Sequence, residues 1–218
     1  MPSRGLLFVV PVLVGLAGCS VGSNSCTYGS NSDGSCNPRP KPSAEQEQAA
    51  MSGAALRAGL HSYLAAKHAS KVGSVGVNKW GETTFTVRQA LNGPHEYRLT
   101  TYDAAGKPTH GNEEYTSEPN DPFPLRRVHP GALVKAVAAI RARQPDAILR
   151  DAVLTVAPFS DELAWNIQII NDKAPSSLVY QVLPDGSHLC HGKDVNPQDG
   201  LHIAPGLPLC PHPLAALG

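Results

Sequence analysis

Two short segments near the C-terminus carry residues that could do chemistry. His188, Cys190 and His191 lie in one, and Cys210 and His212 lie in the other. Thiolates and imidazoles are ligands that zinc and copper accept, but no Cys-x-x-Cys pair of a closed zinc module is present. In an oxidising compartment the two thiols would instead pair, and a disulfide cannot bind metal through thiolate. We therefore expect a Cys190–Cys210 disulfide, with a metal site at His188, His191 and His212 as the alternative.

A third reactive thiol, Cys19, follows a short apolar run. Residues 5–16 are almost entirely apolar and come after a single side-chain charge, Arg4. A helix of about a dozen residues spans roughly 18 Å, too short for a hydrocarbon core of about 30 Å. Charge, short apolar run and small residues form the layout of a secretory signal, although a buried helix of a globular domain is the alternative.

The end of that run specifies the kind of signal. Leu16-Ala17-Gly18-Cys19 resembles the lipobox of bacterial lipoproteins at every position. The resemblance implies a diacylglyceryl group, with acyl chains such as palmitate, on the sulfur of Cys19 and cleavage before this residue. Two acyl chains suffice for stable anchoring. The resemblance thus implies a lipid-anchored protein on the extracytoplasmic face of the cell membrane, where a cell-envelope protein is a possible partner.

The cysteine count favours a lipid on Cys19 over the alternative, a structural disulfide at this residue. Without Cys19, four of the five cysteines remain: Cys26, Cys36, Cys190 and Cys210. An even number suits a chain that has been exported into an oxidising compartment. We expect Cys26 to pair with Cys36, while the alternative joins one of them to Cys190 or Cys210.

Charge and motifs narrow the class of function. The chain has 18 basic and 18 acidic residues, and loss of Arg4 with the signal leaves a net charge of about −1. No basic face is implied, so we expect no nucleic-acid partner. The sequence has no Gly-x-Ser-x-Gly, no His-Glu-x-x-His and no glycine-rich phosphate loop. We expect no cofactor and lean against an enzyme, but a hydrolase with a dispersed site stays open.

The elements that position these residues follow from periodicity. A helix is predicted over 44–71, with Ser43 as N-cap and an apolar stripe of Leu56, Leu60, Tyr63 and Leu64. Strands are predicted at 83–87 and 96–102, with another possible over 72–80. After 113–128, a second helix begins at His129-Pro130, and strands follow at 152–157, 163–170 and 177–183.

The two halves can be aligned. Ala55-Leu56 matches Ala132-Leu133, Thr83, Phe85 and Val87 match Leu163, Trp165 and Ile167, and Gly106 matches Gly186. Coincidence between two generic segments is the alternative. We predict an α+β fold, with two similar helix-plus-antiparallel-sheet units after a disordered N-terminal tether. The expected divisions are a signal at 1–18, a flexible tether at 19–43, a first unit at 44–112, a linker at 113–128, a second unit at 129–189 and a disulfide-pinned segment at 190–218.

The second half also resembles the tandem PepSY-like or cystatin-like units of exported bacterial proteins. The residues concerned are Trp165-Asn166-Ile167, and Val179-Tyr180-Gln181-Val182 followed by Asp185-Gly186. The resemblance implies non-catalytic units that bind or restrain a partner, and it specifies no site residues. The sequence therefore predicts an anchored binding module of unknown ligand, with a metal-binding lipoprotein as the alternative.

Overall fold

The computed structural model describes residues 39–66, 68–88, 97–109, 113–115, 121–156, 162–171, 174–192 and 204–211. The chain divides into two compact units, Met1–Lys41 and Pro42–Gly218. The first unit contributes only residues 39–41 to the described part, so the fold below is that of the second unit. Cys19, Cys26, Cys36 and His212 lie outside the described residues.

The described part of the second unit contains three α-helices: α1 (Ala44–Met51), α2 (Ala54–Ala65) and α3 (Pro130–Arg143). Ser43 caps α1 as predicted, because its hydroxyl accepts from Gln46 N while the Gln46 side chain accepts from Ser43 N. The prediction of one helix over 44–71 is wrong, since Gly53 has a φ of 69° and separates α1 from α2. A left-handed residue cannot continue a right-handed helix.

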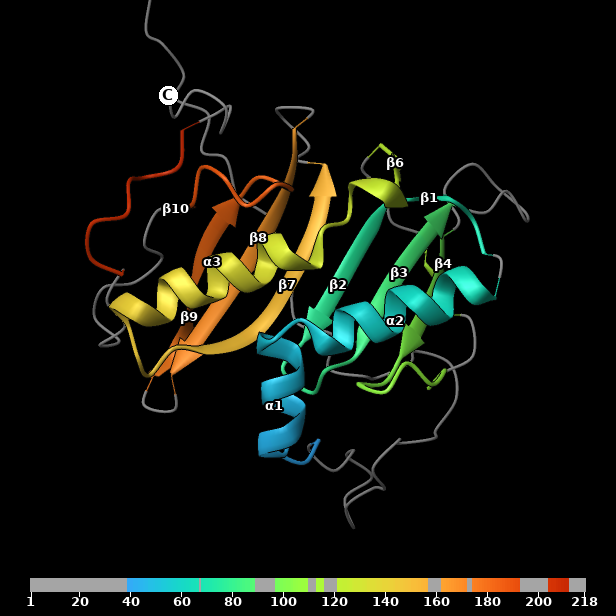
Figure 1. The fold of residues 1–218 in the computed structure, drawn as a ribbon, viewed down its shortest axis with the longest axis horizontal. Coiled ribbons are helices and arrows are strands. Elements are labelled where there is room, and N and C mark those ends of the chain that lie inside the picture. Colours follow the sequence, from blue (N-terminus) through green and yellow to red (C-terminus); the bar gives the residue numbers. More distant parts are fainter. Residues whose placement is uncertain are drawn as a thin grey trace, which may run out of the picture. The chain divides into compact units, whose positions relative to one another are not determined.

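One antiparallel sheet of eight strands carries the helices (Figure 1). Its strand order is β10-β9-β8-β7-β2-β3-β4-β5. The strands are β2 (Ser74–Asn78), β3 (Thr83–Arg88), β4 (Tyr97–Tyr102), β5 (Glu113–Tyr115), β7 (Ile148–Val156), β8 (Leu163–Asn171), β9 (Ala174–Val182) and β10 (Cys190–His191). A separate two-stranded sheet joins β1 (Lys71–Val72) to β6 (Phe123–Pro124), and a 3-10 helix, η1 (Leu125–Arg127), follows β6. The α+β class is thus as predicted.

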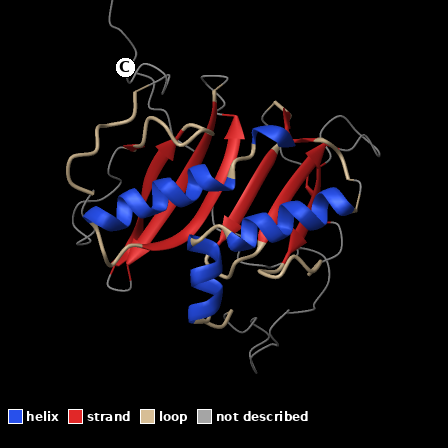
Figure 2. Cartoon of the chain, in the orientation of Figure 1, coloured by secondary structure: helices blue, strands red, loops and turns tan. Residues whose placement is uncertain are grey.

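Helices α2 and α3 both cross the same face of the sheet (Figure 2), which forms the core. Strand residues alternate between buried and half-buried along β2 and β7, as expected where one face of a sheet packs against helices. Trp165 is fully buried there. Leu64 was predicted to line the buried stripe of α2, but it is 58% exposed.

The predicted linker at 113–128 contributes to the folded unit. It contains β5, β6 and η1, and Phe123, Leu125 and Val128 are buried in the main core. These three side chains lie in a proline-rich stretch without apolar periodicity, so the sequence pattern did not predict their burial.

The sheet joins the two halves of the chain through its two central strands. Strand β2 pairs with β7, and Gly76 lies opposite Val153. The turn after β4 closes with Gly106 N donating to Asp103 O, and the turn after β9 closes with Gly186 N donating to Leu183 O, both at 2.9 Å. The two turn glycines have φ values of 81° and 85°.

Candidate functional site

The C-terminal cysteines form the predicted disulfide. Cys190 and Cys210 are joined across a sequence separation of 20, with their Cα atoms 5.0 Å apart. Cys190 is buried at the start of β10, the edge strand, and packs with Ala164 and Cys210. The bond removes both thiolates from the set of ligands that a metal at this end could use.

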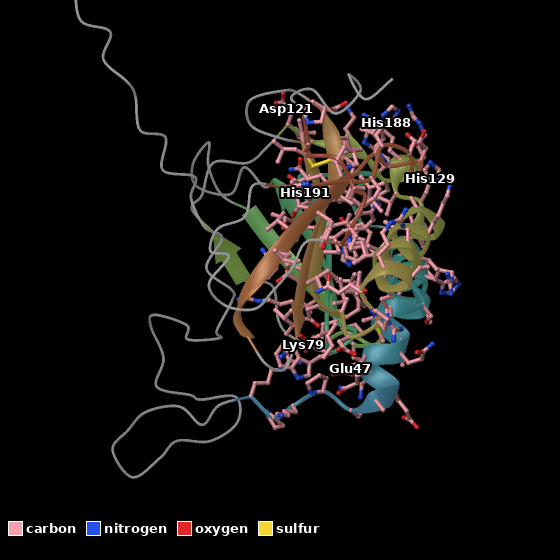
Figure 3. The ribbon with its side chains drawn as sticks, turned by 90° about the vertical axis from the view of Figure 1, so that its left-hand side faces the viewer. Glu47, Lys79, Asp121, His129, His188 and His191 are labelled. Atoms are coloured by element: carbon pink, nitrogen blue, oxygen red, sulfur yellow. A yellow bond between two sulfur atoms is a disulfide. The ribbon has the colours of Figure 1, made fainter. Side chains whose placement is uncertain are left out.

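The histidines at this end do not converge among the described residues. Figure 3 shows His188 toward the helix layer, while His191 lies on the edge strand. His191 Nδ1 donates to Gly192 O at 2.8 Å, and His188 has a φ of 58°. Within the described ranges, no three His, Cys, Asp or Glu side chains gather as a metal site requires. His212 lies outside those ranges, so a metal site that includes it stays a prediction.

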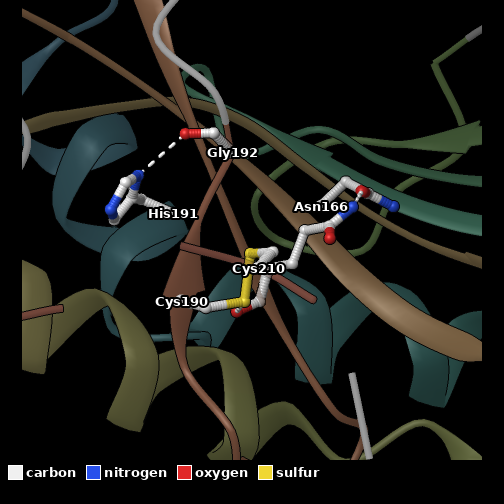
Figure 4. The surroundings of a disulfide bond; sticks show 6 residues. Asn166, Cys190, His191, Gly192 and Cys210 are labelled. Atoms are coloured by element: carbon white, nitrogen blue, oxygen red, sulfur yellow. Dashed lines mark hydrogen bonds between the residues drawn. A yellow bond between two sulfur atoms is a disulfide. The ribbon is translucent and has the colours of Figure 1, made fainter. Parts of the chain in front are cut away.

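Residues 204–211, which we term the C-terminal strap, run along the outer edge of β10. His191 N donates to Pro208 O at 2.9 Å, and Cys210 N donates to His191 O at 2.8 Å. Ala204 N donates to the hydroxyl of Tyr180 at 2.9 Å, which fixes the start of the strap to the core. Figure 4 shows the disulfide of the strap beside Asn166, whose side chain accepts from Gln181.

The second face of the sheet, which we term the open face, lies opposite α2 and α3. No described helix covers it, and its side chains are mostly hydroxyls and amides that are half-buried. The polar residues of this face are Ser74, Asn78, Thr84, Thr86, Thr101, Asp151, Thr155, Asn166, Gln168 and Gln181, and the others are Gly76, Leu99, Ile148, Val153, Ile170 and Val179.

Short hydrogen bonds order this surface. The Ser74 hydroxyl donates to Thr86 Oγ1 at 2.9 Å, across the β2–β3 pair. The Gln181 amide donates to Asn166 Oδ1 at 2.8 Å, across the β8–β9 pair. Cross-strand side-chain pairs of this kind hold their partners in defined rotamers. The open face therefore presents an array of donors and acceptors with little formal charge.

Asp151 is the carboxylate at the centre of the open face. Its cross-strand neighbours are Asn78 on β2 and Gln168 on β8. Burial raises the pKa of this carboxyl above its ordinary value, and the nearby Arg150 guanidinium, at 3.8 Å, opposes the rise only in part. Residues with amide side chains therefore lie opposite Asp151 on both neighbouring strands, and the Asn78 amide itself donates to Glu82 Oε2 at 2.9 Å.

Gly76 lies in the middle of the open face, although the fold does not require a glycine there. A Cβ at this position would meet Ala152 O and a Val153 methyl at 3.7 Å, which is ordinary van der Waals contact. Glycine weakens a strand interior by its extra backbone entropy, and it often marks a place where another molecule approaches the backbone. Its position points to this face as a contact surface.

The open face was not predicted from the sequence. The sequence feature that pointed to this face was the alternation of polar residues along the predicted strands, such as Thr84 and Thr86 on either side of Phe85. Alternation tells which residues share a face, but it does not tell which strands lie side by side. Trp80 lies in the turn between β2 and β3; it is half-buried, and the Lys79 ammonium lies 4.7 Å from its ring centroid.

Comparison with known proteins adds no family. No family model matches the chain, and no significant match is found among curated proteins or solved structures. Among the helices of the described ranges, none combines the length and the apolar character that crossing a membrane requires.

Proposed function

We propose that this chain is a lipid-anchored extracytoplasmic lipoprotein whose second unit is a non-catalytic binding module. Two features support the proposal from independent directions. The lipobox-like Leu16-Ala17-Gly18-Cys19 supports the anchor. The polar open face, with Gly76 at its centre, supports the binding role and is the observation that carries it.

The open face suits recognition better than bond-breaking chemistry. Most of its described polar side chains are hydroxyls and amides, which hydrogen-bond to a partner without acting as strong acids, bases or nucleophiles. Asp151 is the one carboxylate among the open-face residues named above, and its cross-strand neighbours are amides. General acid–base catalysis generally pairs a titratable group with a second group in a defined role.

The anchor is tested by labelling cells with radioactive palmitate and separating membrane from soluble fractions. The full-length chain is expected to carry label and to sediment with membranes. Cys19→Ala is expected to lose both properties, whereas Cys36→Ala, as a matched cysteine control, keeps them. Label that persists in Cys19→Ala would remove the basis for the anchor.

The binding surface is tested by photo-crosslinking in the native envelope. A photoreactive amino acid replaces Thr84 or Gln168 on the open face, or Ala138 or Ala142 on the exposed side of α3. We expect discrete crosslinked species from the two open-face positions and none from the two helix positions. Equal crosslinking from both faces, or from α3 alone, would refute the open face as the contact surface.

We also propose that the second unit of the chain consists of two similar halves, α2–β2–β3–β4 and α3–β7–β8–β9. Hydrogen-bond registers support this. Val75, Phe85 and Thr100 form one cross-strand row, and Ala152, Ile167 and Tyr180 form another. Corresponding members are separated by 77, 82 and 80 residues. In the structure, β3 and β8 therefore correspond at an offset of 82 residues, whereas the sequence alignment paired them at an offset of 80.

The central pair of strands has the symmetry that such a duplication requires. Val75 pairs with Leu154, and Val77 pairs with Ala152. With a separation of 77, Ala152 corresponds to Val75 and Leu154 to Val77, so each half makes the same contact to the other. An experimental structure in which the two halves cannot be superposed through these residue pairs would contradict the duplication.

A further inference from the structure

We propose that the Cys190–Cys210 disulfide is a reducible latch, which holds the C-terminal strap against β10 and opens on reduction while the rest of the domain stays folded. The proposal goes beyond the binding role above and does not depend on it. It follows from how few other contacts hold the strap, from the unequal burial of the two cysteines and from what the strap covers.

Within the described ranges, the strap has few attachments to the domain besides the disulfide. Its backbone joins the domain through the two hydrogen bonds with His191 and the one from Ala204 N to the Tyr180 hydroxyl. Ala204 is the one strap residue that is fully buried, and Leu207 is partly buried against the core. The remaining large apolar side chain, Leu209, is 49% exposed. Segments with few buried contacts open at low free energy, independently of the core.

The two sulfur-bearing residues differ in exposure, which sets the direction of the reaction. Cys190 is fully buried, whereas Cys210 is only half-buried. A thiolate of an incoming dithiol therefore attacks Cys210 Sγ, and Cys190 leaves as a thiolate that takes a proton from solvent. The second thiol of the reductant then attacks the mixed disulfide and releases Cys210 as a thiol. The domain gains two thiols, and the dithiol becomes a disulfide.

An acceptor is already in place for the released thiol. Cys190 Sγ lies 3.6 Å from Gln181 O, within the range of an S–H···O hydrogen bond. The oxidised sulfur carries no hydrogen, so this interaction exists only after reduction. It leaves the buried Cys190 thiol with a partner on β9, which allows the edge of the sheet to stay folded when the strap leaves.

Opening would uncover a polar edge. In the closed state, the N–H and C=O of His191 are both paired with the strap, by Pro208 O and Cys210 N. Once the strap leaves, these groups and the Tyr180 hydroxyl lose their partners in the strap. An edge strand with free backbone groups is a site where an extended segment can add. The strap thus occupies an edge that reduction makes available.

Hydrogen exchange measured by mass spectrometry on the full-length chain tests the latch. Dithiothreitol is the reductant, and the variant Cys190→Ala/Cys210→Ala is the matched control, because Cys26 and Cys36 are present in both chains. On reduction, protection of strap amides such as Cys210 N is expected to fall by about 100-fold, the loop-closure effect of a disulfide of this span. Amides of β7 and β8 are expected to keep their protection.

The control variant and the chemistry of the thiols complete the test. The double variant is expected to show the low strap protection without dithiothreitol, and no further change with it. Alkylation should trap the two thiols in protein whose β7 and β8 amides are still protected. The latch is refuted if strap protection survives reduction, if β7 and β8 lose protection together with the strap, or if the disulfide reacts only as fast as the whole domain unfolds.

Discussion

Alanine substitution at the two turn glycines probes how closely each turn packs on its helix. Gly106 follows β4 with a φ of 81°, and a Cβ there would lie 2.8 Å from both Ala58 O and Ser62 Oγ of α2. Gly186 follows β9 with a φ of 85°, and its Cβ would lie 3.2 Å from Ala132 Cα of α3. Both turns therefore need glycine, but Gly106 faces the tighter contact.

The expected changes in the free energy of unfolding follow from three terms. A left-handed conformation costs an L-residue about 1–2 kcal/mol, and an overpacked contact costs about 1–3 kcal/mol. The smaller entropy of alanine in the unfolded chain returns about 0.4–1 kcal/mol. For Gly106→Ala the blocking atom is a helix carbonyl, so we expect a loss of about 2–4 kcal/mol. For Gly186→Ala the contact needs a shift of only a few tenths of an ångström, so we expect about 1–2 kcal/mol.

Gly131 is the matched control on α3. It is exposed, and a Cβ there would meet no atom within 4 Å. Alanine in a helix is favoured over glycine, so Gly131→Ala is expected to stabilise by about 0.5 kcal/mol. Urea unfolding followed by circular dichroism, on a chain without residues 1–19, gives the three values. Equal losses for Gly106→Ala and Gly131→Ala, or a smaller loss for Gly106→Ala than for Gly186→Ala, would refute the packing argument.

Three further substitutions test single groups. The fully buried hydroxyl of Tyr63 has no hydrogen-bond partner among the residues that the structure describes, and burial holds its pKa far above the ordinary value. The unfolded phenol ionises first, so stability should fall as pH rises above about 10, and Tyr63→Phe should flatten this fall in pH-dependent urea titrations without loss at pH 7. The raised pKa of Asp151 means that its folded form prefers the proton, so its favourable contribution is present at acid pH and lost as pH rises. Asp151→Asn should therefore unfold at higher temperature than wild type at pH 7, with a difference that vanishes below about pH 4; an equal difference at both pH values would contradict the assignment. Ser43→Ala removes the cap of α1 and should cost about 1 kcal/mol in urea, whereas alanine at the exposed Ser70 should change nothing measurable.

Local sequence patterns were sufficient to predict much of the secondary structure. The N-cap at Ser43, the start of α3 at Pro130 and the strand at Thr83 lie where the sequence predicts them. Each of these features depends on the conformational preference of one residue or on a short run of side chains with a regular apolar period. The break at Gly53 was missed because an isolated glycine in a helical pattern is usually tolerated. Only the structure shows that this residue has a left-handed φ and that a Cβ there would lie 2.7 Å from a Val134 methyl.

The sequence by itself determined the polarity pattern of each strand, the expected partner of each C-terminal cysteine and the lipobox-like segment that supports the anchor. Only the tertiary structure decided that β2 pairs with β7, which merges the two predicted sheets into one and creates a continuous open face. It also decided that Phe123 and Leu125 of the supposed linker belong to the core. The physical reason is that strand pairing and core burial join residues far apart in the chain, so no local run of side chains records them.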